Sequence, residues 1–498
     1  MTQSARAVVG IDAGTSTFEV SCISRTGLAR PIDFPDGGDT LRSVAFFEDA
    51  ETPLIGAEAE NMGLNRPERM VRHWKRAMGG DEALYTSPAG VAWTAEDLLV
   101  RFLELCKNAA EADAGLIHDH AVITVPANYA DAAKASTRNA GQRVGFDRVE
   151  LIHEPTAAAF ARLANGEKPS VADGIRLVCD KGGGTFDATV LEKAGNDFHV
   201  RATGGVPHLG GMDHTQTLVD LCIDRFVAKT GATLSAAEHP EAWADLWFRC
   251  EAAKPRLNHA GKATIHIVCD TLREQITLTD AEVREATRPL ITQMIACIEQ
   301  TLRDAGVALD EVIELLPVGG GSQFFVVREA LQEFFGRPLS DAGDPIHCVA
   351  HGAALRGWEA AGEVQVDSAT RLPAPGRSVR DVTAHPLGVL ALTEAGERAF
   401  TPILAKGAPM PSRHRKTFRL SEDGATEVDI RILQGLGSLA PDDCAELGQI
   451  AVSGLQPVWD RPHNVDIELS IDADGLLTAT ATDPLDGATA DMTCTYTR

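Results

Sequence analysis

Two glycine-rich stretches decide the fold of this chain: Ile11-Asp12-Ala13-Gly14-Thr15-Ser16-Thr17 near the start, and Asp180-Lys181-Gly182-Gly183-Gly184-Thr185-Phe186-Asp187 further on. An apolar run precedes each stretch and another follows it, which is typical of a strand, a glycine turn and a second strand. Neither stretch contains GxxxxGK[ST] or is followed by a helix pattern, which excludes a Walker-type phosphate loop. The sequence therefore predicts two hairpins of one kind.

The residue types in these two turns suit a phosphate group that carries a divalent cation. Where glycine removes Cβ, backbone amides can converge on an anion, and the neighbouring Thr and Ser hydroxyls add donors. The aspartates would repel bare phosphate, but they suit a hydrated divalent cation bound to it. Two ordinary hairpins with Gly and Asp at their bends are the alternative. The recurrence of acid and hydroxyl in both turns favours a paired phosphate clamp.

Composition and charge restrict the classes of function. The 498-residue chain is 44% hydrophobic and 23% charged, which predicts two to four globular domains. A net charge of -25 disfavours nucleic acid as a partner, because that binding rests on Lys and Arg. The sequence shows no secretory signal and no apolar run of the roughly 20 residues that a membrane span needs. Ten cysteines without a CxxC pair predict reduced core residues of a cytoplasmic protein.

A further acid lies between the two turns, at the end of a predicted strand. Residues 149–152 predict this strand, and Glu154 follows it directly before a predicted helix. The carboxyl end of a strand is where α/β sheets place ligands, but an acid at a helix start is an equally good interpretation.

The chain after the second turn repeats the strand and helix pattern of the first half. Thr279 and Glu282 form a capping box for a long helix, whereas Pro255 should kink or end the helix predicted over 241–257. The third glycine turn, Gly319-Gly320-Gly321, either lets the backbone approach a nucleotide or makes a simple tight turn.

The residue composition of the sequence changes after residue 363. Prolines, Gly376 and polar residues make 364–380 an interdomain linker. Beyond it the apolar residues alternate in period two, and Asp474-Gly475 marks a hairpin, which predicts a β-sandwich over 381–498.

The sequence resembles the seventy-kilodalton heat-shock (Hsp70) chaperone family. The resemblance covers nearly the whole chain in the family's order. It implies an α/β, two-lobed actin-like ATPase of duplicated ribonuclease-H-like folds over 1–363, then the linker, then a peptide-binding sandwich. The matching segments are GIDAGTST (10–17), VITVPANYADAAKASTRNAG (122–141), HEPTAAAFA (153–161), DKGGGTFD (180–187), HLGGMD (208–213), DVTAHPLGV (381–389) and IDADGLL (471–477).

The resemblance implies ATP and ADP as ligands, with Mg²⁺ and with K⁺ as a further candidate. Asp12 and Asp180 would hold the hydrated metal. Lys75 matches the lysine that positions the attacking water, and Glu154 and Asp187 would orient water and metal. Catalysis would rest on Lys75, Glu154, Asp187 and Thr185. The implied nucleotide contacts are Gly14, Thr15, Ser16, Gly182, Gly183, Gly184, Thr185, Glu251, Lys254, Asn258, Gly319, Gly320 and Gly321.

The adenine end departs from the family pattern. Two arginines that sandwich the base in this family align with Pro255 and Gln323, and each lost stacking plane removes about 1 to 2 kcal/mol. Nucleotide affinity is therefore the weakest inherited property. Lys181 replaces an apolar residue, either as an extra phosphate contact or as a snorkelling surface lysine, and we favour the second.

In the β-rich region the resemblance implies a cleft for unfolded or extended polypeptide segments. Its implied residues are Val389, Leu392, Phe418, Val428, Ile430 and Val465. For Val428 and Ile430 the period-two pattern fits the core of a sandwich equally well. A J-domain cochaperone and a nucleotide exchange factor are further implied partners.

Two departures concern coupling and peptide release. The family joins its domains by an aliphatic run, whereas Arg377-Ser378-Val379-Arg380 is polar here, and coupling needs a segment whose contacts differ between states. No helical pattern follows the β-rich region where the family has a lid, so we expect bound peptide to leave quickly. The sequence predicts an ATP-dependent chaperone; a non-catalytic scaffold and a small-molecule kinase on the same ATPase fold are the alternatives.

Overall fold

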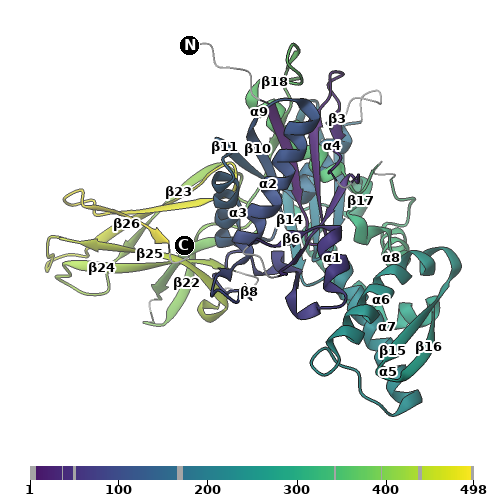
Figure 1. The fold of residues 1–498 in the computed structure, drawn as a ribbon. Helices are drawn as coiled ribbons and strands as arrows, with labels where there is room; N and C mark the ends of the chain where they lie inside the picture. The colour runs from purple at the N-terminus through teal and green to yellow at the C-terminus, as the bar shows by residue number, and fades with distance from the viewer. Residues whose placement is uncertain are drawn as a thin grey trace.

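In the computed structural model each of the two glycine turns connects two central strands of a sheet. The structure describes residues 7–35, 37–48, 52–164, 172–340, 344–393, 395–435 and 440–494. Figure 1 shows an α/β body with a separate β-rich unit at one side of it. The predicted fold class is therefore confirmed.

Each glycine turn joins two antiparallel strands, as predicted. In the first lobe β1 (Ala7–Ala13) pairs antiparallel with β2 (Thr17–Ile23) and parallel with β10 (His118–Val125). In the second lobe β12 (Gly174–Lys181) pairs antiparallel with β13 (Thr185–Ala194) and parallel with β17 (Val312–Val318). The same pairing twice confirms the repeat. The remaining strands of the two sheets are β3 (Ala29–Pro31), β4 (Thr40–Arg42) and β11 (Arg148–His153) in the first, and β14 (Asp197–Pro207) and β20 (Ser378–Arg380) in the second.

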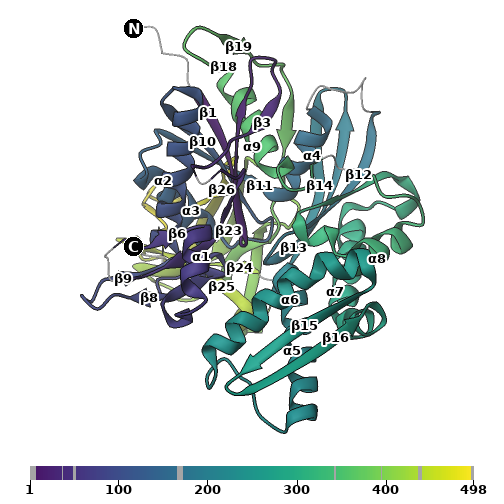
Figure 2. The ribbon, with the colours of Figure 1, turned by 45° about the vertical axis from the view of Figure 1, so that its right-hand side comes forward.

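Two helices, α4 (Glu154–Ala164) and α9 (Cys348–Ala361), pack between the two sheets (Figure 2). Their apolar residues form one core with Val8, Val122 and Val178 of the central strands. The helices approach closely because Gly352 lacks a side chain: a Cβ there would lie 1.8 Å from the carbonyl oxygen of Ala157. Both lobes therefore meet through a packed apolar layer.

The other elements of the α/β body surround this centre. Helices α2 (Ala95–Ala114) and α3 (Asp131–Arg143) belong to the first lobe, and their buried residues pack with β1 and β10. Short elements complete it: β5 (Val44–Phe46), β6 (Leu54–Ile55), α1 (Ala57–Gly63), β7 (Met70–Arg72), β8 (Tyr85–Thr86) and β9 (Ala92–Trp93). The second lobe adds α5 (Gly211–Thr230), α6 (Pro240–Ala260), β15 (Lys262–Cys269), β16 (Leu272–Thr279), α7 (Asp280–Ala305) and α8 (Phe325–Phe335).

Two local expectations in the second lobe have opposite outcomes. The Thr279 and Glu282 capping box is confirmed at the start of α7, where Thr279 N donates to Glu282 Oε2 at 2.9 Å. The sequence predicts that Pro255 kinks or ends its helix; an end is wrong, because α6 continues to Ala260, and the kink stays a prediction. Cys250 and Leu257, on either side of Pro255, are buried in the core of the lobe, and this packing outweighs the lost backbone donor.

The segment 364–380, predicted as a linker, is largely paired. Strands β18 (Glu363–Gln365) and β19 (Arg371–Pro373) form a hairpin, and β20 then joins the second lobe's sheet parallel to β14. Its polar residues contribute to this placement, since Arg377 Nε donates to Glu359 Oε1 at 2.6 Å.

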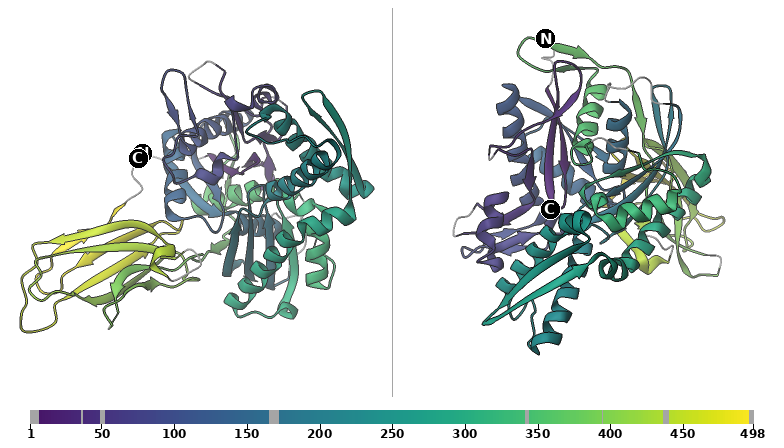
Figure 3. Two further views of the ribbon diagram at one scale, coloured as in Figure 1. Left: turned by 90° about the horizontal axis from the view of Figure 1, so that it is seen from below. Right: turned by 90° about the vertical axis from the view of Figure 1, so that its right-hand side faces the viewer.

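The β-rich unit is a sandwich of two antiparallel sheets (Figure 3, left). Its core lies between them and includes Val389, Ile450 and Ile467. One sheet contains β21 (Leu387–Leu392), β22 (Arg398–Leu404), β24 (Glu427–Gly435), β25 (Cys444–Ser453) and β29 (Thr493–Cys494); the other contains β23 (Ser412–Arg419), β26 (Asn464–Ile471), β27 (Leu477–Thr482) and β28 (Thr489–Asp491). Among the described helices, none has the length and apolarity that a membrane span requires.

Candidate functional site

The two glycine turns face each other across a cleft between the lobes. A Cβ on Gly183 would lie 2.0 Å from Ser16 Oγ, and a Cβ on Gly184 would lie 2.7 Å from Thr15 Oγ1. The second turn is also tied to the start of α5, because Gly211 N donates to Gly182 O at 2.9 Å. Glycine at 183 is therefore a requirement of the approach between the turns.

Below the turns lies a cavity of about 640 Å³. Glu154 reaches it from the start of α4, and Glu251 and Lys254 reach it from α6. All of the residues predicted for nucleotide and metal line it, together with Glu154 of the predicted catalytic set: Asp12, Gly14, Thr15, Ser16, Asp180, Gly182, Gly183, Gly184, Thr185, Glu251, Lys254, Asn258, Gly319, Gly320 and Gly321. Lys75 and Asp187 are buried beside the cavity and are not part of its lining.

An ion pair occupies the floor of the cleft. Lys75 Nζ lies 2.6 Å from Glu154 Oε1, and both residues are buried. Tyr129 fixes the lysine's backbone, since its hydroxyl donates to Lys75 O at 3.1 Å. On the other side of the floor Thr124 Oγ1 donates to Asp12 Oδ1 at 2.7 Å.

The carboxylates of this floor have strongly perturbed pKa values. Burial, followed by repulsion from Glu154, raises the pKa of Asp12 to about 7 and that of Asp187 to about 8. The same two causes raise the pKa of Asp180 well above its usual range. Burial opposes the charge of Lys75, but Glu154 and the neighbouring acids raise its pKa.

These acids lack enough positive charge in the protein itself. Neither carboxylate oxygen of Asp187 has a hydrogen-bond partner among the described residues, although both are buried. Buried carboxylates are costly unless they are paired or coordinate a metal, and oxygen donors are what Mg²⁺ prefers. The donor set therefore fits a divalent cation.

Arg76 is a site residue that sequence reasoning missed. Its guanidinium donates to Gly184 O at 2.8 Å and to Asp213 Oδ2 at 2.7 Å. Asp213 also accepts from Gly210 N at 2.7 Å. Arg76 thus connects the first lobe to the second turn and to the start of α5. The sequence feature that could have identified Arg76 is its position directly after Lys75.

The interpretation of Lys181 as a surface lysine is wrong. Its side chain is fully buried, and its Nζ donates to Leu209 O at 2.6 Å. Burial lowers its pKa to about 7. The strand places Lys181 on the sheet face opposite to Asp180, so it supports the turn from behind.

The far end of the cavity is lined by apolar and amide side chains. Pro255 and Gln323 lie there with Phe248, Phe324 and Ile346. The amide of Asn258 is already engaged, because Nδ2 donates to Gln323 O and Oδ1 accepts from Phe325 N, both at 2.9 Å. Asn258 therefore holds the third glycine turn against α6.

The residues predicted for peptide binding are distributed over core and surface. Val389, Ile430 and Val465 are buried in the sandwich core, and Phe418 and Val428 pack against it, partly exposed. Leu392 is 53% exposed at the end of β21.

The β-sandwich contacts both lobes. Arg138 of α3 pairs with Asp472 at 3.2 Å, and Lys406 pairs with Asp304 of α7 at 2.6 Å. At the connection the side chain of Asp381 is only 11% exposed and accepts from Thr156 Oγ1 at 2.9 Å.

Comparison with known proteins agrees with this architecture. The family described as "Hsp70 protein" matches residues 8–498. The chaperone protein DnaK of Methanothermobacter thermautotrophicus is 31% identical over 487 residues, which cover 96% of this chain and 78% of that protein.

Proposed function

This chain belongs to the Hsp70 family, and from this premise we propose that it is a chaperone that hydrolyses ATP to ADP. It would bind exposed apolar segments of unfolded proteins. One observation carries the proposal: the buried pair of Lys75 and Glu154 lies with three further carboxylates beneath two facing glycine turns.

The phosphates would lie against the two turns. Thr15 and Ser16 supply hydroxyls from one side, and Gly182, Gly184 and Thr185 supply backbone and hydroxyl donors from the other. Asp12 and Asp180 would hold Mg²⁺, which neutralises phosphate charge when bound. K⁺ is proposed as a second cation of the same cleft.

Hydrolysis would depend on position and charge rather than on covalent chemistry by the protein. The ammonium of Lys75, held by Glu154, lies at the floor of the cleft. It would orient the attacking water and stabilise charge on the terminal phosphoryl group. Asp187 and Thr185 would complete the set, with the buried carboxylate of Asp187 orienting the water and the metal.

The β-sandwich would bind the polypeptide. We propose 1–363 as the ATPase domain, 364–380 as the connection and 381–498 as the peptide-binding domain. Leu392, exposed at the end of β21, and the partly exposed Phe418 and Val428 would contact peptide, with Val389, Ile430 and Val465 beneath them. A J-domain cochaperone, a nucleotide exchange factor and a cytoplasmic location complete the proposal.

The test is ATP affinity by calorimetry and single-turnover hydrolysis, each with and without an unfolded peptide. We expect slow Mg²⁺-dependent hydrolysis that peptide stimulates and that collapses in Asp187→Asn. Asp220→Asn, a change at an exposed residue of α5, is the matched control. Absence of ATP binding would overturn the proposal.

One observation favours a second function, a scaffold that binds nucleotide weakly. Both polar ends of Asn258 are bonded to backbone, and Pro255 offers no donor at the far end of the cavity. ATP binding without turnover, unchanged in Lys75→Ala, would identify this function. ATP turnover that requires an added sugar or alcohol would instead indicate a small-molecule kinase.

A further inference from the structure

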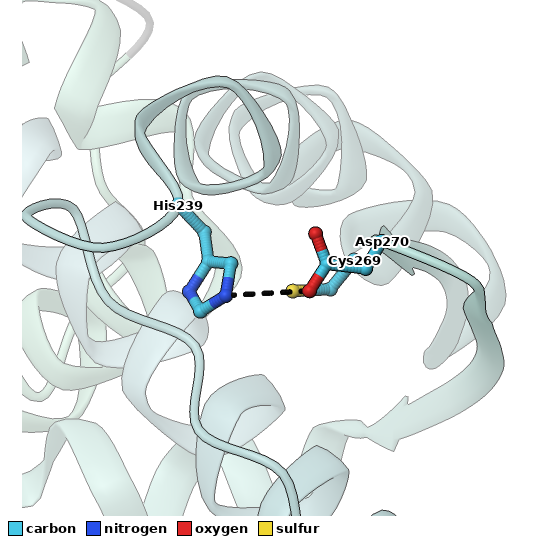
Figure 4. Close-up of side chains that lie close together, drawn as sticks. All are labelled: His239, Cys269 and Asp270. Atoms are coloured by element: carbon cyan, nitrogen blue, oxygen red, sulfur yellow. Dashed lines mark ion pairs between the residues drawn. The ribbon is translucent and has the colours of Figure 1, made fainter.

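Three different metal-ligating side chains converge in the second lobe, away from the cleft. Figure 4 shows His239, Cys269 and Asp270 pointing toward one another. One donor atom from each, a ring nitrogen, a thiol sulfur and a carboxylate oxygen, lies within 4.8 Å of the other two. His239 directly precedes α6, Cys269 ends β15, and Asp270 follows in the hairpin turn.

The backbone holds these residues in place. His239 N donates to Ser235 O at 2.9 Å, and its carbonyl accepts from Trp243 N at 2.9 Å. Cys269 and Leu272 close a two-residue hairpin, in which Asp270 takes a positive φ of 52°. Asp tolerates this left-handed conformation better than most residues. The turn therefore directs the thiol and the carboxylate to the same side as the imidazole.

These donors are not satisfied by one another. Cys269 is only 2% exposed, and its thiol has no hydrogen bond among those found in the described residues. His239 Nε2 lies 3.5 Å from Asp270 Oδ2, which is longer than a normal hydrogen bond. The Nδ1 atom of His239 is buried without a partner in the described part of the chain. Three side chains that can ligate a metal thus converge without a hydrogen bond of normal length between His239 and Asp270.

We propose that His239, Cys269 and Asp270 form a binding site for a borderline-soft divalent metal ion of the Zn²⁺ type. A thiolate, an imidazole and one carboxylate suit Zn²⁺, whereas Mg²⁺ and Ca²⁺ require oxygen ligands. Three protein ligands leave a fourth position of the tetrahedron for water.

The spacing requires one small movement. Metal-ligand bonds of about 2.0 to 2.3 Å place tetrahedral ligand atoms roughly 3.3 to 3.8 Å apart, so the widest separation closes by about 1 Å. His239 Nε2 and Asp270 Oδ2 are already 3.5 Å apart, so the wider separations are those to the thiol of Cys269, and the 76% exposed side chain of Asp270 is free to follow the metal. Bound metal would connect the segment before α6 to the β15 and β16 turn. Because Nδ1 of His239 lacks a supporting acceptor, the site should be weaker than a four-ligand structural zinc site.

Cobalt titration of the whole chain tests the proposal. The protein is stripped with EDTA, dialysed and titrated with Co²⁺, and thiolate-to-cobalt charge transfer is followed in the near ultraviolet. Zn²⁺ is then added as competitor. We expect one Co²⁺ with a thiolate band that Zn²⁺ displaces.

Single substitutions assign the ligands. Cys269→Ser should abolish the band, and His239→Gln and Asp270→Asn should each weaken Zn²⁺ binding about tenfold or more. His266→Gln, at an exposed histidine of the same hairpin, and Cys444→Ser in the β-sandwich are matched controls that should retain it. A circular dichroism spectrum that matches the parent protein shows that each variant is folded.

Two results would overturn the site. One is the absence of a charge-transfer band at stoichiometric Co²⁺ in the parent protein. The other is a band that survives in folded Cys269→Ser, which would place the thiolate ligand elsewhere. Metal bound to the acidic cleft gives no such thiolate signal from Cys269, so the outcome does not depend on the proposed ATPase function.

Discussion

The Nζ atom of Lys75 lies 2.6 Å from Oε1 of Glu154, and the two residues are 79 positions apart in the chain. Each is at least nine-tenths buried. A buried ion pair of this kind depends on both partners, because the loss of one leaves an uncompensated charge. The pair therefore links the stability of the first lobe to the chemistry of the cleft.

Replacement of Lys75 should separate binding from turnover. In Lys75→Ala we expect single-turnover ATP hydrolysis to fall at least about 100-fold, because the cation that stabilises developing phosphoryl charge is lost. The free energy of unfolding should fall by about 3 kcal/mol, since Glu154 is left buried and unpaired. Lys229→Ala, at an exposed lysine of α5, is the control. Hydrolysis within threefold of the parent rate would contradict the assignment.

Alanine at two adjacent glycines should have different effects. In Gly183→Ala the new Cβ would meet Ser16 Oγ at 2.0 Å, so the turns must separate, and we expect a loss of about 1 to 3 kcal/mol in nucleotide-free stability. A Cβ on Gly182 meets nothing within 4 Å, and Gly182→Ala should change stability by less than about 0.5 kcal/mol. Denaturant unfolding measures both. Equal effects would show that the turns do not approach this closely.

Stability of the metal-free and nucleotide-free protein should fall as pH rises toward 8. The pKa values of Asp12 and Asp187 are about 7 and about 8 in the folded protein, against about 4 when unfolded. The folded state therefore holds extra protons, and the stability they confer is present below pH 4 and is lost as pH rises through 7 and 8.

Thermal unfolding at pH 6 and pH 8.5 checks this dependence. Added Mg²⁺ with ADP should stabilise the protein more at pH 8.5 than at pH 6, because protons compete with the metal for the same carboxylates. Asp187→Asn should reduce the change in unfolding temperature between pH 6 and pH 8.5. A change of opposite sign in the metal-free protein would contradict the assigned protonation.

Asp381 should control how the β-sandwich contacts the lobes. Its carboxylate accepts from Thr156 Oγ1 at 2.9 Å and lies 2.9 Å from His153 Nδ1. In Asp381→Ala we expect the free energy that favours the docked arrangement of the β-sandwich to fall by about 2 kcal/mol. The radius of gyration measured by small-angle scattering should then increase. Arg380→Ala, at the exposed preceding residue, should leave the radius unchanged. An unchanged radius in Asp381→Ala would show that other contacts hold the domains.

The sequence predicts an element correctly where residues close together in the chain are sufficient to form it. The two strand, glycine turn and strand units, the capping box of Thr279 and Glu282, and the hairpin at Asp474-Gly475 are all present. Glycine conformation, side-chain capping and period-two alternation act over a few residues. The family resemblance, which rests on such stretches, is confirmed over residues 8–498.

Sequence reasoning failed where neighbours far along the chain decide the outcome. Lys181 is buried against Leu209 O, because the second lobe closes over it. Helix α6 continues through Pro255, because Cys250 and Leu257 on either side pack into the core.

The sequence by itself determined the two strand, glycine turn and strand units and the β-sandwich, since these follow from local backbone preference and from the spacing of apolar residues. Only the tertiary structure decided that Ser16 opposes Gly183, that Lys75 pairs with Glu154 and that Arg76 reaches Gly184. These are contacts between segments 79 to 167 positions apart. Their distances depend on how two sheets pack around α4 and α9, and no local pattern contains that information.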